Sequence, residues 1–476
     1  MSEASEINTE NLEASGSGRE SQDCVEKKST IEEKEKSKLE SCEDDTTREA
    51  SRNPLQRRLV SLKTEQNVKR GPKFTVMTYN VLADKWASSH KHKACPSDAL
   101  KWEYRREKLV SEIISYNADI ICLQEVQEEH YVDFNNALTR QGYEGFYLPK
   151  LSGNAAHRDG CATFFQSEKF SCMKTFDIMY GSHEFLDSLP SKLSGTLERY
   201  GLLSVKLFNI RDNVALIVLL SFKSNVVCIA NTHLVARGDI PEVKMWQTYC
   251  LLQKLQEIVG SLGNDDVAIV ICGDFNSRPP SAAYSFLVHN EIDPEHKELE
   301  VGYGIRFDAN KLRRSSIDLS SAYSAYFEQG VSDDSSFNDD NVMKRWMNSE
   351  TKEPMFTHYA FDFKETLDYI FYTHNNLEVQ KLLEVVDWDI VTRAEDRFIP
   401  STVWPSDHIL LLAQFCCIGD RENTKKRKRQ TSDDSPDREI DTESLKTESK
   451  GKEQEIDHGT RWEPSPSVQN DNATCT

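Results

Sequence analysis

Short apolar runs recur along the chain, and most of them end in polar residues. The clearest run covers residues 267–272 and is followed by Gly273-Asp274-Phe275-Asn276. A run of this length is typical of a buried strand, and alternation along a strand predicts that Asp274 and Asn276 share one face. The tetrad alone is equally compatible with a strand that runs into a turn, because Gly, Asp and Asn are turn formers. Comparable strands are predicted over residues 74–80, 119–125, 226–233, 367–372 and 409–415.

Helices are expected between these strands. Apolar residues at helical spacing predict helices over 98–116, 242–259 and 281–289, with Ser97 or Asp98 as the cap of the first. Residues 214–222 and 226–230, joined by three polar residues, predict a hairpin, so the sheet should be mixed. Strands in company with helices indicate an α/β or α+β domain. The strand–helix–strand order recurs in both halves, which favours two sheets packed as a sandwich with outer helices.

The two ends of the chain differ from the middle in composition. Residues 1–68 are acidic and rich in Ser, and residues 419–476 are charged, so we expect both to be disordered. Residues 69–418 hold nearly all the aromatic residues and form the predicted catalytic domain. The net charge of −20 argues against a broad surface that coats nucleic acid phosphates. It remains compatible with a local phosphate pocket, because a site that recruits a divalent cation is itself acidic.

The cysteine pattern favours a reducing compartment. The 12 cysteines show no metal-binding spacing, and several lie in apolar runs, where free Cys behaves as a small buried hydrophobe. There is no signal peptide and no apolar stretch long enough to cross a membrane, so no membrane partner is expected. The basic cluster 425–429 is either a nuclear import signal or RNA-binding patch, or a solvated charge run. We expect the protein in nucleus and cytoplasm.

The polar residues at the strand ends indicate a hydrolytic site. Glu125 and Asp407 are the hard oxygen ligands that Mg²⁺ prefers. His408 could bond a phosphate oxygen, and Asp368 could orient its ring. His233 could face the same site. Each of these residues taken singly is equally well a surface or packing residue, and their number favours a shared site.

Seven motifs along the chain are similar, in order, to those of the endonuclease/exonuclease/phosphatase superfamily. They are Tyr79-Asn80-Val81-Leu82, Leu123-Gln124-Glu125-Val126, Asp159-Gly160-Cys161-Ala162, Asn231-Thr232-His233-Leu234, Gly273-Asp274-Phe275-Asn276-Ser277, Leu367-Asp368-Tyr369-Ile370-Phe371 and Pro405-Ser406-Asp407-His408. Within the superfamily the chain resembles the catalytic domain of carbon catabolite repressor protein 4, a messenger RNA deadenylase. The resemblance covers about residues 73–415.

The resemblance implies a four-layer α/β sandwich of the deoxyribonuclease I type, with two mixed β-sheets flanked by helices. It also implies a Mg²⁺-dependent 3′-to-5′ exoribonuclease that uses one or two ions and removes poly(A) tails from single-stranded messenger RNA. The resemblance also implies roles for single residues. Glu125 would be the principal metal ligand, with Asn80 and Asp407 beside the metal, and Asp274 would activate a water that Asn276 positions. His408, oriented by Asp368, would stabilise the phosphate, and His233 and Lys150 would contact the substrate. Phe363 is either a base-stacking or a packing residue.

The chain departs from the deadenylase pattern after His233. Gly238 stands where that branch has a proline that contacts adenine, and Leu234-Val235-Ala236-Arg237 resembles nocturnin, a relative that removes the 2′-phosphate of NADP(H). Arg237 would then bind a substrate phosphate, unless it is a solvated loop residue. A third hypothesis is a catalytically silent RNA-binding or scaffold protein. No leucine-rich repeat precedes the domain, so the sequence does not support docking to a deadenylation complex.

Overall fold

The computed structural model describes residues 55–64, 70–150, 158–182, 213–263, 267–302, 305–306, 315–332, 340–393 and 397–418, all within the unit Met1–Arg421. The basic cluster 425–429 lies outside these residues. No helix in the described ranges is long and apolar enough to cross a membrane.

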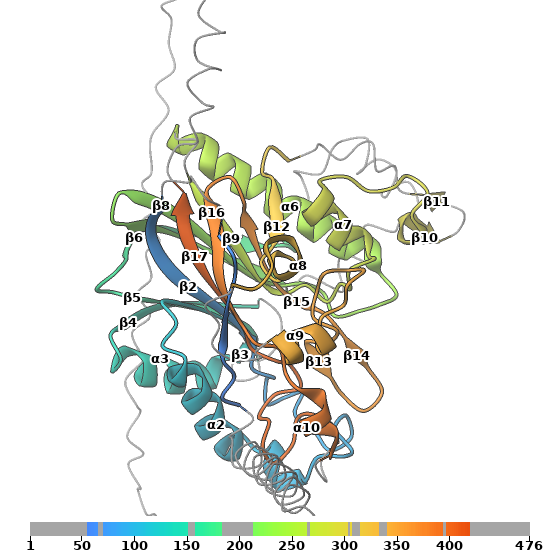
Figure 1. Ribbon diagram of the computed structural model, residues 1–476. Helices are drawn as coiled ribbons and strands as arrows, with labels where there is room; N and C mark the ends of the chain where they lie inside the picture. The colour runs from blue at the N-terminus through green and yellow to red at the C-terminus, as the bar shows by residue number, and fades with distance from the viewer. Residues whose placement is uncertain are drawn as a thin grey trace, which may run out of the picture. The chain divides into compact units, whose positions relative to one another are not determined.

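Two mixed sheets form the centre of the fold (Figure 1). In the described part of the chain, the first sheet has the order β1 (Leu59–Ser61), β16 (Leu377–Leu383), β17 (Leu411–Ile418), β2 (Arg70–Asn80), β3 (Ile120–Gln127), β5 (Asp159–Gln166) and β4 (Tyr143–Pro149). The second has the order β12 (Leu319–Ser321), β15 (Asp368–Thr373), β9 (Ala268–Asp274), β8 (Asn225–His233), β7 (Val214–Phe222) and β6 (Ser171–Met179). Two small antiparallel pairs accompany them: β10 (Glu300–Gly302) with β11 (Ile305–Arg306), and β13 (His358–Tyr359) with β14 (Lys364–Glu365).

Each sheet contains one parallel pair, β2–β3 in the first and β8–β9 in the second. A helix connects the strands of each pair: α2 (Trp102–Ser115) joins β2 to β3, and α6 (Pro241–Leu262) joins β8 to β9. Parallel strands need such a crossover, and it brings their carboxyl ends to the same edge. The predicted recurrence of the strand–helix–strand order is therefore present. In each sheet, the two strands of the parallel pair end at the same edge.

The remaining helices of the described residues are short. They are η1 (Ser97–Leu100), η2 (Glu128–His130), α3 (Tyr131–Thr139), α7 (Ala282–His289), η5 (Lys297–Leu299), α8 (Ala325–Gln329), α9 (Asp340–Trp346) and α10 (Trp388–Arg393). Ser281 caps α7 by accepting a hydrogen bond from the backbone N–H of Tyr284 at 3.2 Å, as the sequence signature of a helix start would predict.

Three apolar clusters divide the fold into four layers. Between the sheets, Val76 and Cys122 of the first pack with Val218 and Val270 of the second. The outer face of the first sheet is covered by α2 and α3, and that of the second by α6 and α7. Both sheets are thus buried on both faces, which explains why their central strands read as continuous apolar runs. The predicted four-layer α/β sandwich is confirmed.

Three local features differ from the expected ones. β1 pairs with β16, so the first sheet includes a strand that precedes residue 69. Neither Ser97 nor Asp98 caps α2, because the chain makes a separate 3₁₀ turn there and α2 begins after Lys101 without a side-chain cap. Asn276 lies beyond β9, which ends at Asp274.

Candidate active site

Polar side chains from both sheets meet where the parallel strands end. β2 ends at Asn80, and β8 and β9 end side by side at His233 and Asp274. Asp368 opens β15 directly opposite Asp274. Gly273 permits this crowding, because a Cβ at its position would lie 1.9 Å from the Thr232 carbonyl oxygen. The strand-end residues predicted from the sequence are therefore neighbours in space.

Asp274 is the buried centre of the group. Its Oδ2 accepts a hydrogen bond from Asn80 Nδ2 at 3.0 Å, and its Oδ1 accepts one from the backbone N–H of Asn276 at 2.9 Å. The Nε2 atoms of His408 and His233 lie 3.7 Å and 3.6 Å from Asp274 Oδ2. The carboxylate is thus fixed in orientation and faces two imidazole rings from opposite sheets.

Asn276 reaches the site by a different route from the one predicted. Strand alternation does not place it beside Asp274, because the strand has ended and Asn276 has a left-handed φ of 48°. The side-chain amide of Asn276 donates to the carbonyl of Leu234 at 3.0 Å. The backbone carbonyl of Asn276 accepts a hydrogen bond from Lys244 Nζ. Asn276 therefore holds the turn after β9 against the turn after β8, and its backbone N–H orients Asp274.

Asp368 holds the ring of His408. The Nδ1 of His408 lies 2.8 Å from Asp368 Oδ2, and both side chains are buried. Burial alone would lower the pKa of His408, but the charges of Asp368 and Asp274 outweigh it and raise that pKa well above its ordinary value. His408 is accordingly a fixed imidazolium whose Nε2 points toward Asp274.

His233 is uncharged, in contrast to His408. Burial, followed by the charge of Lys150, lowers the pKa of His233 to about 4, so its ring is neutral at pH 7. Lys150 Nζ lies 3.5 Å from His233 Nδ1, and an ammonium can only donate, so the ring proton resides on Nε2. Lys150 is also paired with buried Asp159 at 2.6 Å. The predicted substrate contacts His233 and Lys150 thus form one unit beside Asp274.

Glu125 lies at a break in strand pairing. The register between β3 and β5 shifts between Leu123 and Val126, and Glu125 takes a left-handed φ of 57°. A non-glycine residue rarely adopts this conformation, and such strain is concentrated at functional sites. Oε2 accepts a hydrogen bond from the backbone N–H of Ala83 at 2.9 Å. His233 Nε2 lies 4.0 Å from Oε1, so the bulge directs the carboxylate into the cluster.

Glu125 and Asp407 provide a donor set that suits a cation. Burial, then the negative charges of Asp159 and Asp407, raise the pKa of Glu125, which shows that like charges crowd together here. Asp407 Oδ1 is buried and has no hydrogen-bond partner within the described residues. Buried carboxylates of this kind are paired or bind metals, and oxygen donors suit a hard divalent ion. The residues present therefore fit the expected metal.

A cavity of about 200 Å³ opens beside the cluster and is lined by Asn276, Gly238, Phe363 and Arg278, among others. Phe363 is 46% exposed, and its ring contacts that of His358 at 5.4 Å between centroids, so only part of the ring is available to a ligand. Arg237 does not line this cavity; its guanidinium lies at the surface, where Nη2 and Nε bond Asp239 at 2.6 Å and 3.0 Å. The structure thus places Phe363 near the cluster, and Arg237 is engaged elsewhere.

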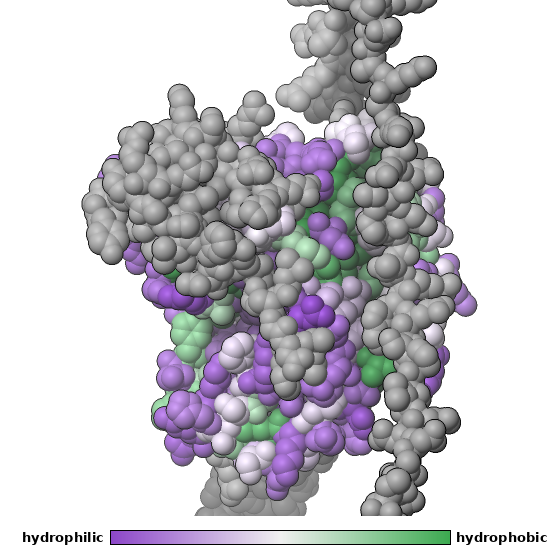
Figure 2. Space-filling view, turned by 180° about the vertical axis from the view of Figure 1, so that it is seen from behind, coloured by the Kyte–Doolittle hydropathy of each residue, from purple (hydrophilic) through white to green (hydrophobic). Residues whose placement is uncertain are grey.

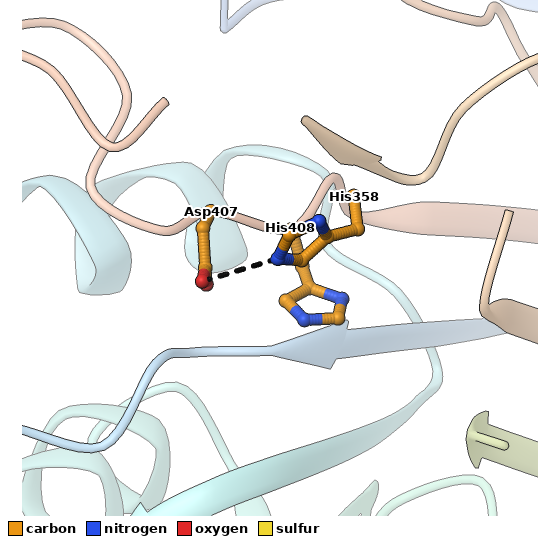
Figure 3. A group of neighbouring side chains, drawn as sticks. All are labelled: His358, Asp407 and His408. Atoms are coloured by element: carbon orange, nitrogen blue, oxygen red, sulfur yellow. Dashed lines mark ion pairs between the residues drawn. The ribbon is translucent and has the colours of Figure 1, made fainter. Parts of the chain in front are cut away.

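Three polar residues at the site were not assigned a role from the sequence. Asp159, which begins one of the seven motifs, is buried beneath Lys150. His358, on β13, and His92, on the connection between β2 and η1, approach Asp407. Figure 3 shows the imidazole of His358 facing the Asp407 carboxylate beside His408. Neither histidine follows an apolar run, so no strand-end signal marks them.

The sequence profile of the Endonuclease/Exonuclease/phosphatase family matches residues 77–408, which span the whole cluster. The chain belongs to this family. The predicted resemblance to the superfamily is confirmed. The match begins within β2 and ends at His408, so it includes the whole second sheet and both connecting helices but not β1 and β17 of the first sheet.

Curated relatives point to one branch of the family. "Carbon catabolite repressor protein 4 homolog 2" of Arabidopsis thaliana is 38% identical over 72% of this chain and 57% of its own length. "CCR4-Not complex 3'-5'-exoribonuclease subunit Ccr4" of Schizosaccharomyces pombe is 32% identical over 72% of this chain and 49% of its own length. The chain therefore spans about half the length of the curated relatives it matches. The predicted resemblance to carbon catabolite repressor protein 4 is confirmed.

Solved structures confirm the fold. A crystal structure of ANGEL2, described as a 2',3'-cyclic phosphatase in complex with adenosine-2',3'-vanadate, has a TM-score of 0.55 and 26% identity. It covers 74% of this chain and 99% of the ANGEL2 chain. Family, relatives and fold together support a nuclease or phosphodiesterase.

Proposed function

We propose that this protein is a Mg²⁺-dependent 3′-to-5′ exoribonuclease that hydrolyses the poly(A) tails of messenger RNA and releases 5′-nucleotides. The observation that carries the proposal is the convergence of Glu125, Asp274 and His408 from separate parts of the chain on one buried group. The names of the relatives, which include an exoribonuclease of Schizosaccharomyces pombe, supply the reaction class.

Asp274 is the proposed general base. One of its oxygens is held by Asn80 and the other by the backbone of Asn276, so the carboxylate cannot rotate away from the reacting water. A base in a fixed position contributes about 10²–10⁴-fold to a hydrolytic rate. Asn80 serves in this geometry mainly as the orienting partner of Asp274, since its own Oδ1 already accepts from the backbone N–H of Leu82 at 3.0 Å.

His408 and His233 are the proposed phosphate-binding pair. The His408 imidazolium, pinned by Asp368, donates from Nε2 to a phosphoryl oxygen as negative charge develops. The neutral His233 donates from its own Nε2, and Lys150 adds a positive charge behind it. The two Nε2 atoms lie 3.6 Å and 3.7 Å from Asp274 Oδ2, so a phosphate bound by the two rings would lie beside the proposed base.

Glu125 and Asp407 are the proposed metal ligands. These carboxylates would hold Mg²⁺, which would supply charge neutralisation on the phosphoryl oxygens. The cavity beside Asn276 extends the site in the direction of Phe363, whose exposed ring offers a stacking surface for a base of single-stranded RNA. The domain limits 69–418 would, on this proposal, be widened to include β1.

A second candidate is a phosphatase that removes a 2′-phosphate from NADP(H). It is favoured by the similarity to ANGEL2, a 2',3'-cyclic phosphatase, and by the position of Gly238, where the sequence departs from the deadenylase pattern, in the lining of the cavity. A silent scaffold is the least supported candidate, because the described residues retain a base, an imidazolium and two carboxylates in one group.

One assay separates these candidates. Purified protein is offered labelled oligo(A), mixed-sequence RNA, NADPH and a 2′,3′-cyclic-phosphate oligonucleotide, each with Mg²⁺ and with chelator. Stepwise shortening from the 3′ end is expected, faster for oligo(A) than for the mixed sequence. Phosphate release from NADPH without shortening would instead establish the phosphatase. Failure to turn over any substrate, by protein that is folded, would overturn both.

A further inference from the structure

Arg105 is a buried charge that joins two segments of the candidate active site. Hydrophilic residues, in purple, cover much of the described surface on the face shown in Figure 2, and charged side chains normally lie at such a surface. Arg105, on α2, is instead 0% exposed. Because burial of a charge is costly, such a side chain is expected to have a full set of partners.

The guanidinium of Arg105 finds most of these partners on the chain that follows β2. Nη1 donates to the carbonyl oxygens of Val81 at 3.1 Å and Leu82 at 2.9 Å. Nε donates to the carbonyl oxygen of Leu100 at 3.0 Å, and Nη2 lies 3.4 Å from Asp84 Oδ1. Arg105 therefore holds the turn that begins where β2 ends.

The same side chain also contacts a segment that lies 300 positions later in the sequence. Nη1 of Arg105 lies 3.3 Å from the carbonyl oxygen of Pro405, two residues before Asp407. One side chain thus connects the turn after β2 to the loop that carries Asp407. The planar fork of a guanidinium can serve several acceptors at fixed angles, which the compact ammonium of a lysine cannot do.

Each of the two segments holds a proposed metal ligand. The backbone N–H of Ala83, next to Leu82, donates to Glu125 Oε2 at 2.9 Å, so the turn after β2 fixes that carboxylate. Leu82 itself has a left-handed φ of 57°, a conformation that needs support from its surroundings. The carboxylates of Glu125 and Asp407 are therefore carried, directly or through one hydrogen bond, by the segments that Arg105 joins.

We propose that Arg105 is a positioning residue for the cation of the hydrolytic site. It fixes the separation of Glu125 and Asp407, and the inference rests on the proposed function, which names these two residues as metal ligands. Outer partners of metal ligands hold them in the geometry that the ion requires, and their loss lowers metal affinity by about 10–100-fold. A guanidinium has no acceptor atom and cannot ligate a cation, so Arg105 acts only through the segments it joins.

The competing interpretation is that Arg105 only stabilises the fold. In that case its replacement would lower the melting temperature of the metal-free protein and leave the metal affinity of the folded protein unchanged. Metal affinity therefore separates the two roles, whereas a loss of activity alone would not.

Mn²⁺ binding to metal-free full-length protein, followed by electron paramagnetic resonance without substrate, tests the inference. Mn²⁺ prefers the same oxygen ligands as Mg²⁺. The variant is Arg105→Lys, which keeps the charge and loses the fork. The matched control is Arg106→Lys, on the same helix, because the Arg106 side chain is 41% exposed and its Nη1 lies 3.5 Å from Asp133 Oδ1. Circular dichroism and thermal melting in chelator establish that each variant is folded.

Arg105→Lys should raise the dissociation constant for Mn²⁺ at least about tenfold, and Arg106→Lys should leave it unchanged. Equal Mn²⁺ affinity in wild type and folded Arg105→Lys would overturn this inference and leave the proposed function standing. Wild-type protein that binds no Mn²⁺ would overturn both.

Ser406→Ala provides a second test, which does not depend on how Arg105→Lys folds. The buried hydroxyl of Ser406 donates to the carbonyl oxygen of Asn80 at 2.7 Å and accepts from the backbone N–H of His408 at 3.1 Å, so it joins the same two segments. Ser406→Ala should also weaken Mn²⁺ binding. Unchanged Mn²⁺ affinity in Ser406→Ala, together with an unfolded Arg105→Lys, would contradict the inference.

Discussion

Replacing Glu112 by glutamine should remove a loss of stability that sets in as pH rises. Glu112 lies on the inner face of α2 and is 4% exposed. Its Oε2 accepts a hydrogen bond from the hydroxyl of Tyr79 at 3.1 Å, whereas its Oε1 is buried without a partner among the described residues. Burial disfavours the charged form and raises the pKa of Glu112 to about 7, although the charge of Arg57 opposes it.

Ionisation of Glu112 is linked to folding, so its pKa determines how the free energy of unfolding depends on pH. The folded-state pKa of about 7 exceeds the ordinary value of 4.5, so folding favours the protonated acid. This side chain therefore leaves stability intact below pH 4.5 and lowers it progressively as pH rises to 7. The full loss is about 3 kcal/mol, at 1.36 kcal/mol for each pH unit of that window. Glutamine keeps the shape and the hydrogen bond without the charge.

Urea unfolding at pH 5 and pH 8 measures this effect. The difference in free energy of unfolding, Glu112→Gln minus wild type, should increase by about 2.5 kcal/mol between the two pH values, because part of the full loss has already occurred at pH 5. Other titrating groups, such as buried Glu353, are present in both proteins and cancel in the difference. Glu107→Gln, at an exposed position on the same helix, is the control and should show no such increase. An equal difference for Glu112→Gln at pH 5 and pH 8 would refute the reasoning.

Three further changes test the site. Asp368→Asn should lower kcat on oligo(A) by about 10²-fold or more with little change in KM, because it releases the His408 ring without touching substrate; an unchanged kcat would remove the orienting role. Phe363→Ala should raise KM for RNA about tenfold through lost stacking, whereas Phe361→Ala, 60% exposed nearby, should not; equal effects would indicate packing only. Arg237→Ala should leave RNA shortening unchanged, and a selective loss of NADPH turnover would favour the phosphatase instead.

Much of the fold could be predicted because burial on both faces leaves a plain signal in the sequence. The hairpin of β7 and β8 and the capped helix α7 follow from alternation and turn residues close together in the chain. β1 was missed because three residues at a sheet edge carry too little apolar pattern to be distinguished from the charged segment before them. The cap of α2 was wrong because an extra 3₁₀ turn, not visible in the spacing, precedes it.

The site was predictable only where it follows a strand. Asn80, His233 and Asp274 are each the last residue of a strand. The sequence therefore indicated that they lie at the edges of the sheets and close to one another. Asn276 reaches the same place through a left-handed turn that no alternation rule contains. The positions of His92 and His358 depend on how the connection after β2 and strand β13 pack against Asp407, and tertiary packing alone decides this.

The central claim is that Glu125 and Asp274, from different sheets, serve one cation-dependent hydrolytic site. Single-turnover cleavage of labelled oligo(A), followed over a Mg²⁺ titration for wild type and Glu125→Gln, tests it most directly. Wild-type cleavage should rise to saturation with Mg²⁺ and stop in chelator, while folded Glu125→Gln should stay inactive at Mg²⁺ concentrations that saturate wild type. A Glu125→Gln protein that cleaves at the wild-type rate and with the same Mg²⁺ dependence would contradict the account.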